Sequence, residues 1–153
     1  MSNPNYYIIG ASGLIGSALH KKFSINDNVI GTYKDNFNSN LIKFDLEKFQ
    51  INNFLNSIDG NCVFYLMSAY SNPNWIFLNK NKAFSLNYKS TIKLINHINK
   101  FNGHIIFMSS VEVFDGTEGR YNEKHKPNPL NYYGKLKFDI EKYLKQNVES
   151  YTI

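Results

Sequence analysis

A tyrosine and a lysine stand four residues apart near the end of the sequence, at Tyr133 and Lys137. On a helix, residues at this spacing share one face, so both side chains can point into the same cleft. An ammonium favours the ionised form of a nearby phenol, so we expect Lys137 to lower the pKa of Tyr133 from about 10. Ser110, which follows an apolar run upstream, can add a hydrogen bond to a substrate oxygen. The three residues predict an acid–base site that interconverts a carbonyl and an alcohol.

A glycine-rich turn follows the first apolar run, with glycines at positions 10, 13 and 16. In such a turn the first glycine permits a tight bend, the second lets a diphosphate approach the backbone, and the third lets helix and strand pack closely. The helix that follows offers free N–H groups and a positive dipole end to phosphates. The turn therefore predicts a dinucleotide site. The residues expected to bind the cofactor here are Gly10, Ser12, Gly13, Leu14, Ile15 and Gly16.

The end of the second apolar run bears on which dinucleotide is bound. An acidic residue there would hold the 2′-hydroxyl of NAD. This sequence instead has Tyr33 and Lys34, with Asp35 one position later. A lysine near the 2′ position favours the extra phosphate, so we expect NADP(H) to be preferred over NAD(H).

Short apolar runs alternate with longer stretches whose apolar residues recur at helical spacing. Strands are expected over 6–9, 28–33, 41–44, 62–67, 104–108 and 151–153, and helices over 14–23, 46–57, 79–101 and 131–146. This alternation predicts an α/β protein with a doubly wound parallel sheet of the Rossmann type, in three α/β/α layers. We expect residues 1–153 to form a single dinucleotide-binding domain.

Composition narrows the possible partners. The net charge of +5 comes almost wholly from dispersed lysines beside one arginine, Arg120, so we expect a solvated surface and not a nucleic-acid site. Cys62 is the sole cysteine and excludes an internal disulfide, and the four histidines lack ligand spacing, so no metal site is expected. The sequence has no stretch of transmembrane length and no signal-peptide pattern, which favours a cytoplasmic protein without membrane contact.

Together these motifs resemble the extended branch of the short-chain dehydrogenase/reductase superfamily, over essentially the whole chain. The GxxGxxG turn and the YxxxK pair carry the resemblance. It implies further cofactor contacts at Asp45 and Leu46, which look like the adenine site, and at Ser68, Ala69 and Tyr70 after the fourth strand. It also implies that Asn87 helps to position the active-site lysine.

Within that branch, the segments 109–116, 119–123 and 129–134 look most like dTDP-4-dehydrorhamnose reductases, which reduce the 4-keto group of a nucleotide sugar. The resemblance implies that Tyr133 donates a proton to the carbonyl oxygen, that Lys137 holds the ribose hydroxyls, and that Ser110 binds the substrate oxygen. Val111 stands where related dehydratases carry an acid, which argues against dehydration. Glu112 leaves an epimerase or a decarboxylase open, and a nucleotide-sugar epimerase or dehydratase of the same superfamily is the alternative.

Extended members are about twice as long, so the resemblance implies that most of the C-terminal substrate domain is missing from these 153 residues. A third interpretation is a non-catalytic, dinucleotide-binding regulatory subunit, by analogy with the reductase-like regulators of methionine adenosyltransferase. The resemblance also implies a homodimer through the two long helices, which carry Tyr88, Ile92, Ile140 and Tyr143.

Overall fold

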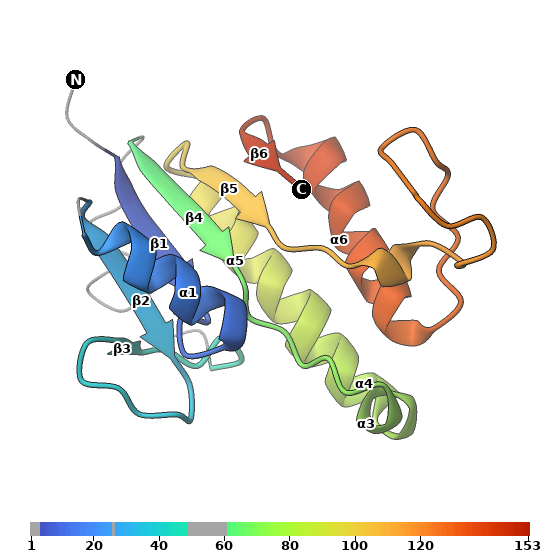
Figure 1. Cartoon of the computed structure of the whole chain (residues 1–153), viewed down its shortest axis with the longest axis horizontal. Coiled ribbons are helices and arrows are strands. Elements are labelled where there is room, and N and C mark those ends of the chain that lie inside the picture. Colours follow the sequence, from blue (N-terminus) through green and yellow to red (C-terminus); the bar gives the residue numbers. More distant parts are fainter. Residues whose placement is uncertain (1–3, 26, 49–60) are drawn as a thin grey trace.

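The computed structural model describes residues 4–25, 27–48 and 61–153. Within these ranges six strands form one sheet in which every neighbouring pair is parallel, in the order β3-β2-β1-β4-β5-β6 (Figure 1). The strands are β1 (Asn5–Ile9), β2 (Val29–Tyr33), β3 (Ile42–Lys43), β4 (Cys62–Leu66), β5 (His104–Phe107) and β6 (Tyr151–Thr152). The doubly wound parallel sheet expected from the sequence is confirmed.

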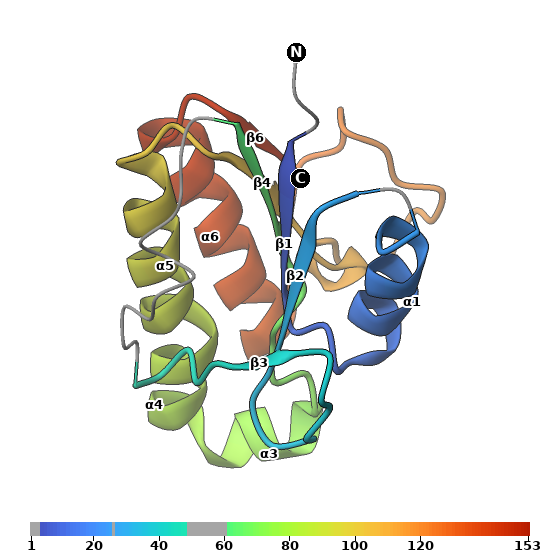
Figure 2. The ribbon, with the colours of Figure 1, turned by 90° about the vertical axis from the view of Figure 1, so that its left-hand side faces the viewer.

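The helices lie on both faces of the sheet. Figure 2 shows α1 on one face and α5 with α6 on the other, which gives the three α/β/α layers. The helices are α1 (Leu14–Phe23), α3 (Pro73–Leu78), α4 (Lys80–Ala83), a π-helix (Phe84–Lys89), α5 (Ser90–Asn99), a 3-10 helix (Val111–Val113) and α6 (Tyr132–Asn147).

The long helix expected over 79–101 is interrupted by the π-helix. The Ser90 hydroxyl donates to the Ser85 carbonyl at 2.9 Å, across the five-residue spacing of a π-turn. The additional helix α3 lies in a segment that the sequence analysis left outside the helices, although Asn72 caps it by accepting from Trp75 N at 2.9 Å. The helix expected over 46–57 falls mostly outside the described residues, and 46–48 form a turn.

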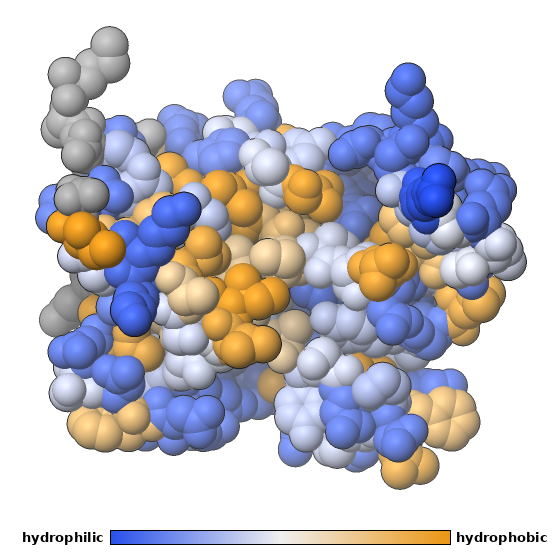
Figure 3. Space-filling view, in the orientation of Figure 1, coloured by the Kyte–Doolittle hydropathy of each residue, from blue (hydrophilic) through white to orange (hydrophobic). Residues whose placement is uncertain are grey.

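The main core lies between the sheet and the pair α5 and α6. Phe64, Ile95, Ile105 and Leu144 are fully buried there. Ile140 is also buried in this core, at 1% exposure, so this residue of the expected dimer helix packs inside its own chain. A smaller cluster around Ile8 lies on the other face of the sheet, and Figure 3 shows apolar side chains at the surface there beside α1.

Candidate functional site

The glycine turn lies at the point in the sheet where the strand order reverses. β1 and β4 are neighbours, but the strands that follow them in the sequence lie on opposite sides, and ligands of doubly wound sheets bind at the carboxyl ends of such strands. Gly10 follows β1 with φ of +94°, and a Cβ added to it would lie 2.9 Å from Ser68 N after β4. The two strand ends therefore contact each other directly.

The turn has the shape that a dinucleotide requires. A Cβ on Gly16 would lie 2.2 Å from the Gly10 carbonyl oxygen, so only glycine allows α1 to begin this close to β1. Gly13 precedes α1 without a side-chain cap, and the first amides of a helix have no intrahelical acceptor. Leu14 and Ile15 are 91% and 50% exposed at this end of the helix. These residues fit the diphosphate of a nicotinamide dinucleotide.

Asn87 fixes the segment that follows β4. Its side-chain oxygen accepts from Tyr70 N at 2.8 Å, and its amide nitrogen donates to the Tyr70 carbonyl at 2.7 Å. The Tyr70 ring in turn lies 4.3 Å from that of Trp75 between centroids. Ser68, Ala69 and Tyr70 are exposed next to the glycine turn. The described hydrogen bonds of Asn87 thus go to Tyr70, and its expected part in positioning Lys137 stays a prediction.

Lys34 extends from the end of β2 to two carboxylates. Its Nζ lies 3.1 Å from Glu47 Oε2 and 3.5 Å from Asp45 Oδ1. Burial lowers the pKa of Lys34, but the hydrogen bond that Lys34 donates to Glu47 and the charges of Asp45, Glu47 and Asp35 outweigh that effect and raise the pKa overall. The adjoining Tyr33 packs edge-on against Phe37, and Leu46 packs against the main core. A 2′-phosphate at Lys34 would therefore compete with the protein's own carboxylates.

Lys137 is buried at the end of β5. Its Nζ donates to the Met108 carbonyl at 2.7 Å and lies 4.6 Å from the centroid of the Phe107 ring. The same Nζ lies 5.7 Å from the centroid of the Tyr133 ring. Burial, opposed by the charge of Glu141, lowers the pKa of Lys137 to about 8. The pair on α6 is thus brought together as expected, with two ammonium N–H donors left for a ligand.

The expected direction of the Tyr133 pKa shift is wrong. Burial of the ring and then the negative charge of Glu112 raise the pKa of Tyr133. The ring packs among α3, α4 and the π-helix, in a cluster with Ile76 and Leu136, and the lysine is directed at the Met108 carbonyl. In this arrangement Tyr133 is a neutral phenol, which can donate a proton.

Ser110 precedes the 3-10 helix that touches the start of α6. Its Oγ accepts from Glu112 N at 3.2 Å, which leaves the O–H free to donate to a substrate oxygen. A Cβ on Gly134 would lie 2.0 Å from the Glu112 carbonyl oxygen, so this glycine lets the 3-10 helix approach the turn of α6 that carries Tyr133. The Glu112 carboxylate accepts from the Asn131 side chain at the amino end of α6.

A hollow of about 1240 Å³ lies beside this site, lined by the end of β5, the loop after it, α6 and the chain end at Ile153. Ser109, Ser110 and Glu141 line it, whereas its described lining does not include Tyr133 or Lys137. Ser110 is therefore the one member of the expected catalytic trio that faces this hollow.

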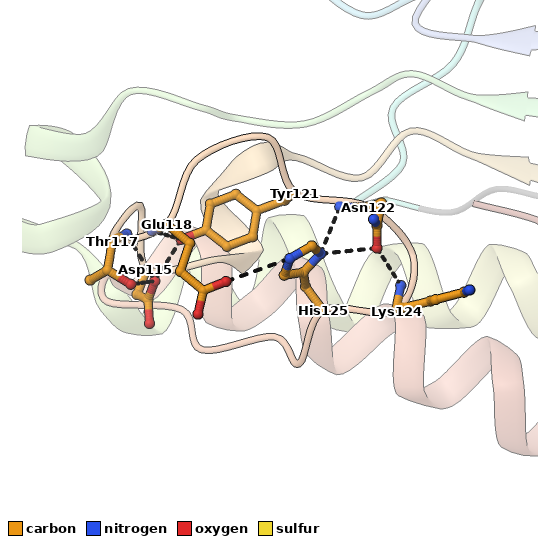
Figure 4. A network of polar contacts seen from close by, with 7 residues as sticks. All are labelled: Asp115, Thr117, Glu118, Tyr121, Asn122, Lys124 and His125. Atoms are coloured by element: carbon orange, nitrogen blue, oxygen red, sulfur yellow. Dashed lines mark hydrogen bonds and ion pairs between the residues drawn. The ribbon is translucent and has the colours of Figure 1, made fainter.

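The loop that forms one wall of the hollow is held by its own side chains (Figure 4). Asp115 accepts from Tyr121 OH at 2.7 Å and from the Thr117 hydroxyl at 2.8 Å, and Asn128 donates to its other oxygen. The hydrogen bonds from Asn128, Thr117 and Tyr121 hold the pKa of the Asp115 carboxyl well below its usual range. His125 lies 3.5 Å from Glu118. Contacts among the loop's own side chains thus hold this wall of the hollow in place.

Two residues of the site, Thr32 and Glu141, escaped the sequence analysis. Buried Thr32 accepts from Gly10 N at 3.1 Å and anchors the glycine turn to β2. Ser109 donates to Glu141, which lies one helical turn after Lys137. The sequence signals that could have indicated them are the polar Thr32 within an apolar strand and the position of Glu141, four residues after Lys137.

Neither a metal-ion cluster nor a membrane-spanning helix occurs in the described part of the chain. There, no three His, Cys, Asp or Glu side chains are grouped so that they could hold a metal ion. None of the helices in the same ranges combines the length and the apolar character needed to cross a lipid bilayer.

The family RmlD substrate binding domain matches residues 5–153. The chain belongs to this family. Curated relatives are methionine adenosyltransferase 2 subunit beta from Bos taurus, 30% identical over 95% of this chain, and from Xenopus laevis, 32% identical over the same share. The chain spans 44% of the length of each, so it is less than half as long as these relatives.

Solved structures confirm the resemblance drawn from the motifs. A hypothetical dTDP-4-dehydrorhamnose reductase from Sulfolobus tokodaii is 28% identical, with a TM-score of 0.82 over 91% of this chain and 51% of its own. The dTDP-4-dehydrorhamnose reductase from Bacillus anthracis in complex with NADP also has a TM-score of 0.82, at 20% identity. The match covers 99% of this chain and 52% of the Bacillus anthracis chain. MoeE5 in complex with UDP-glucose and NAD has a TM-score of 0.78 at 21% identity, over 90% of this chain and 47% of its own. These last two similarities concern the fold alone.

Proposed function

We propose that this chain binds NADP(H) or NAD(H) and supplies the cofactor and proton-donor half of a reductase for a 4-keto nucleotide sugar. The observation that carries the proposal is the buried Lys137 beside the Tyr133 ring, at the sheet edge that also carries the glycine turn. Burying an ammonium costs free energy, and groups whose pKa is perturbed in this way concentrate at functional sites.

Each residue has a separate task in this proposal. The α1 amides and the glycine turn bind the diphosphate, and the two remaining N–H donors of Lys137 hold the ribose hydroxyls. The bound nicotinamide supplies hydride chemistry. Tyr133, neutral because burial raises its pKa, donates its proton to the carbonyl oxygen, and Ser110 orients that oxygen by hydrogen bonding.

The charges at the end of β2 bear on the preference for NADP over NAD. Lys34 supports it by its place at the end of β2, and the carboxylates of Asp45 and Glu47 oppose it. A nucleotide-sugar epimerase is the alternative within the same chemistry. Glu112 would be its base, but that carboxylate already accepts from Asn131.

The test uses the chain itself with its Tyr133→Phe variant. Binding is followed by NADPH fluorescence, and turnover by the loss of absorbance at the nicotinamide band with a 4-keto nucleotide sugar. We expect wild type and variant to bind NADPH alike, and any oxidation of NADPH to occur with the wild type and not with the variant. If the wild-type chain leaves NADPH fluorescence unchanged, the proposal is wrong.

A second candidate is a dinucleotide-binding regulatory subunit. It is favoured by the identity of 30% to methionine adenosyltransferase 2 subunit beta. A regulator would bind a methionine adenosyltransferase catalytic subunit, and the Tyr133→Phe change would leave that binding and its effect on the partner untouched. Gel filtration of the mixed proteins with and without NADPH measures this. The same experiment on the chain alone tests the expected homodimer.

A further inference from the structure

Two neighbouring residues at the end of β5 each hold one side chain of α6. The Met108 carbonyl accepts from Lys137 Nζ at 2.7 Å, and the next residue, Ser109, donates its hydroxyl hydrogen to Glu141. Lys137 and Glu141 are four residues apart and share one face of α6. The end of β5 and α6 are therefore joined by two adjacent hydrogen bonds, one donated by a cation of α6 and one accepted by an anion of α6.

Glu141 is half-buried and lies beside the hollow described above. Burial raises its pKa, whereas the hydrogen bond from Ser109 and the charge of Lys137 oppose that rise. For Lys137 the balance runs the other way, because burial lowers its pKa and the charge of Glu141 raises it. The interaction between the two groups thus favours the ionised form of each, in a place where burial favours both neutral forms.

We propose that Glu141 and Ser109 are positioning residues, which keep Lys137 charged and directed at the end of β5, where it meets the Tyr133 ring. The inference rests on the proposed function, in which the same ammonium holds the ribose of the dinucleotide. Ser109 acts through Glu141, since its hydroxyl orients the carboxylate and favours its ionised form.

The other groups around Lys137 do not replace this carboxylate. β5 presents the Phe107 ring and the Met108 carbonyl, which are uncharged, and α6 also presents the neutral phenol of Tyr133. Glu112 on the 3-10 helix acts on Tyr133, and it accepts from Asn131. Glu141 is the charged side chain whose interaction favours the ammonium of Lys137.

The experiment titrates Lys137 directly. Lysine labelled with carbon-13 at Cε gives each lysine a carbon resonance whose shift follows its own protonation and leaves the buried ammonium unmodified, and Lys137→Met identifies the resonance of Lys137. We expect a midpoint near 8 in the wild type and a clearly lower midpoint in Glu141→Gln. Glu141→Asp should restore part of the difference, because it keeps the charge on a shorter side chain.

Asp139→Asn is the matched control, because Asp139 lies on the same helix but pairs with Lys142 at 2.7 Å. It removes the same charge and should leave the Lys137 midpoint unchanged. Ser109→Ala should lower the midpoint in the wild-type background and have no further effect in Glu141→Gln. If Glu141→Gln does not fold, the Ser109→Ala titration decides alone, and an unchanged midpoint there overturns the proposal.

Measuring NADPH binding tests the proposed function separately from the positioning role of Glu141 and Ser109. At pH 8 we expect Glu141→Gln to bind NADPH about fivefold more weakly than the wild type, since it has lost charge-assisted contacts of Lys137. A lowered midpoint in a chain whose wild type binds no NADPH contradicts the proposed function but not the positioning. An unchanged midpoint in a chain that binds NADPH contradicts the positioning alone.

Discussion

The side-chain amide of Asn87 holds both backbone polar groups of Tyr70, accepting from its N–H at 2.8 Å and donating to its carbonyl at 2.7 Å. Asn87 lies in the π-helix between α4 and α5, where the wider turn changes the direction of the following side chains. The segment after β4 faces the glycine turn, and its backbone is therefore held by a helix that comes later in the sequence.

Replacing Asn87 by Ala should lower the free energy of unfolding by about 2 kcal/mol, because two hydrogen bonds of a buried side chain are lost. Asn87→Asp should cost at least as much, since its carboxylate still accepts from Tyr70 N but its second oxygen then faces the Tyr70 carbonyl oxygen in a buried place. Urea denaturation measures both. Asn81→Ala is the control, because Asn81 is exposed on the neighbouring helix α4, and its stability should stay within about 0.5 kcal/mol of wild type.

Two glycines of the same turn should respond differently to alanine. A Cβ at position 16 would lie 2.2 Å from the Gly10 carbonyl oxygen, whereas at position 13 it would meet the same oxygen at 3.4 Å, an ordinary contact. We expect Gly16→Ala to lower the melting temperature sharply, with a cost above about 2 kcal/mol. Gly13→Ala should melt near wild type and bind NADPH more weakly, because its methyl group projects into the space needed by the diphosphate. Equal melting temperatures for the two variants would contradict this account.

The parts of the fold that depend on local pattern were predictable. The strand after residue 5, the glycine turn and the helix from Leu14 to Phe23 follow from apolar runs, glycine spacing and helical periodicity, and the structure has them at nearly the expected positions. The π-helix was not predictable, because apolar residues at helical spacing tolerate one inserted residue without a visible break. Asn72 followed by Pro73 is a pattern typical of the start of a helix, so α3 was predictable from the sequence although the sequence analysis did not expect it.

The site shows the same division between local and distant causes. The spacing of Tyr133 and Lys137 follows from α6 alone, whereas their pKa values depend first on burial against other elements and then on the charges of Glu112 and Glu141. The ion pair of Lys34 with Glu47 likewise joins two segments across β3. Sequence spacing can show which groups share a helix face, but it cannot show which partner a long side chain reaches.

Lys137 should make stability depend on alkaline pH. Its pKa is about 8 in the folded chain against 10.5 when exposed, so the folded state binds fewer protons than the unfolded state between these values. The free energy of unfolding therefore gains a contribution that increases from pH 8 to about 10, the opposite of a favourable ion pair. Relative to Lys137→Met, which lacks the charge, the wild type should gain about 2 kcal/mol between pH 7.5 and 9.5. Urea denaturation at the two pH values measures it, and Lys135→Met, at an exposed position, is the control. A constant difference between wild type and Lys137→Met would show that the lysine is not buried as described.

Glu47 should limit the affinity for NADP. Its carboxylate lies 3.1 Å from Lys34 Nζ, so a 2′-phosphate must displace it and also meets its negative charge. Glu47→Gln should strengthen NADP binding by about fivefold, in line with a partly exposed charge pair of about 1 kcal/mol, and leave NAD binding unchanged. Isothermal titration with both dinucleotides measures this, and Lys34→Ala should weaken NADP binding alone. Because exposed charges are screened, the gain from Glu47→Gln should shrink when the salt concentration is raised. Equal gains for NAD and NADP would mean that Glu47 acts on the fold of the β2 end, and not on the recognition of the phosphate.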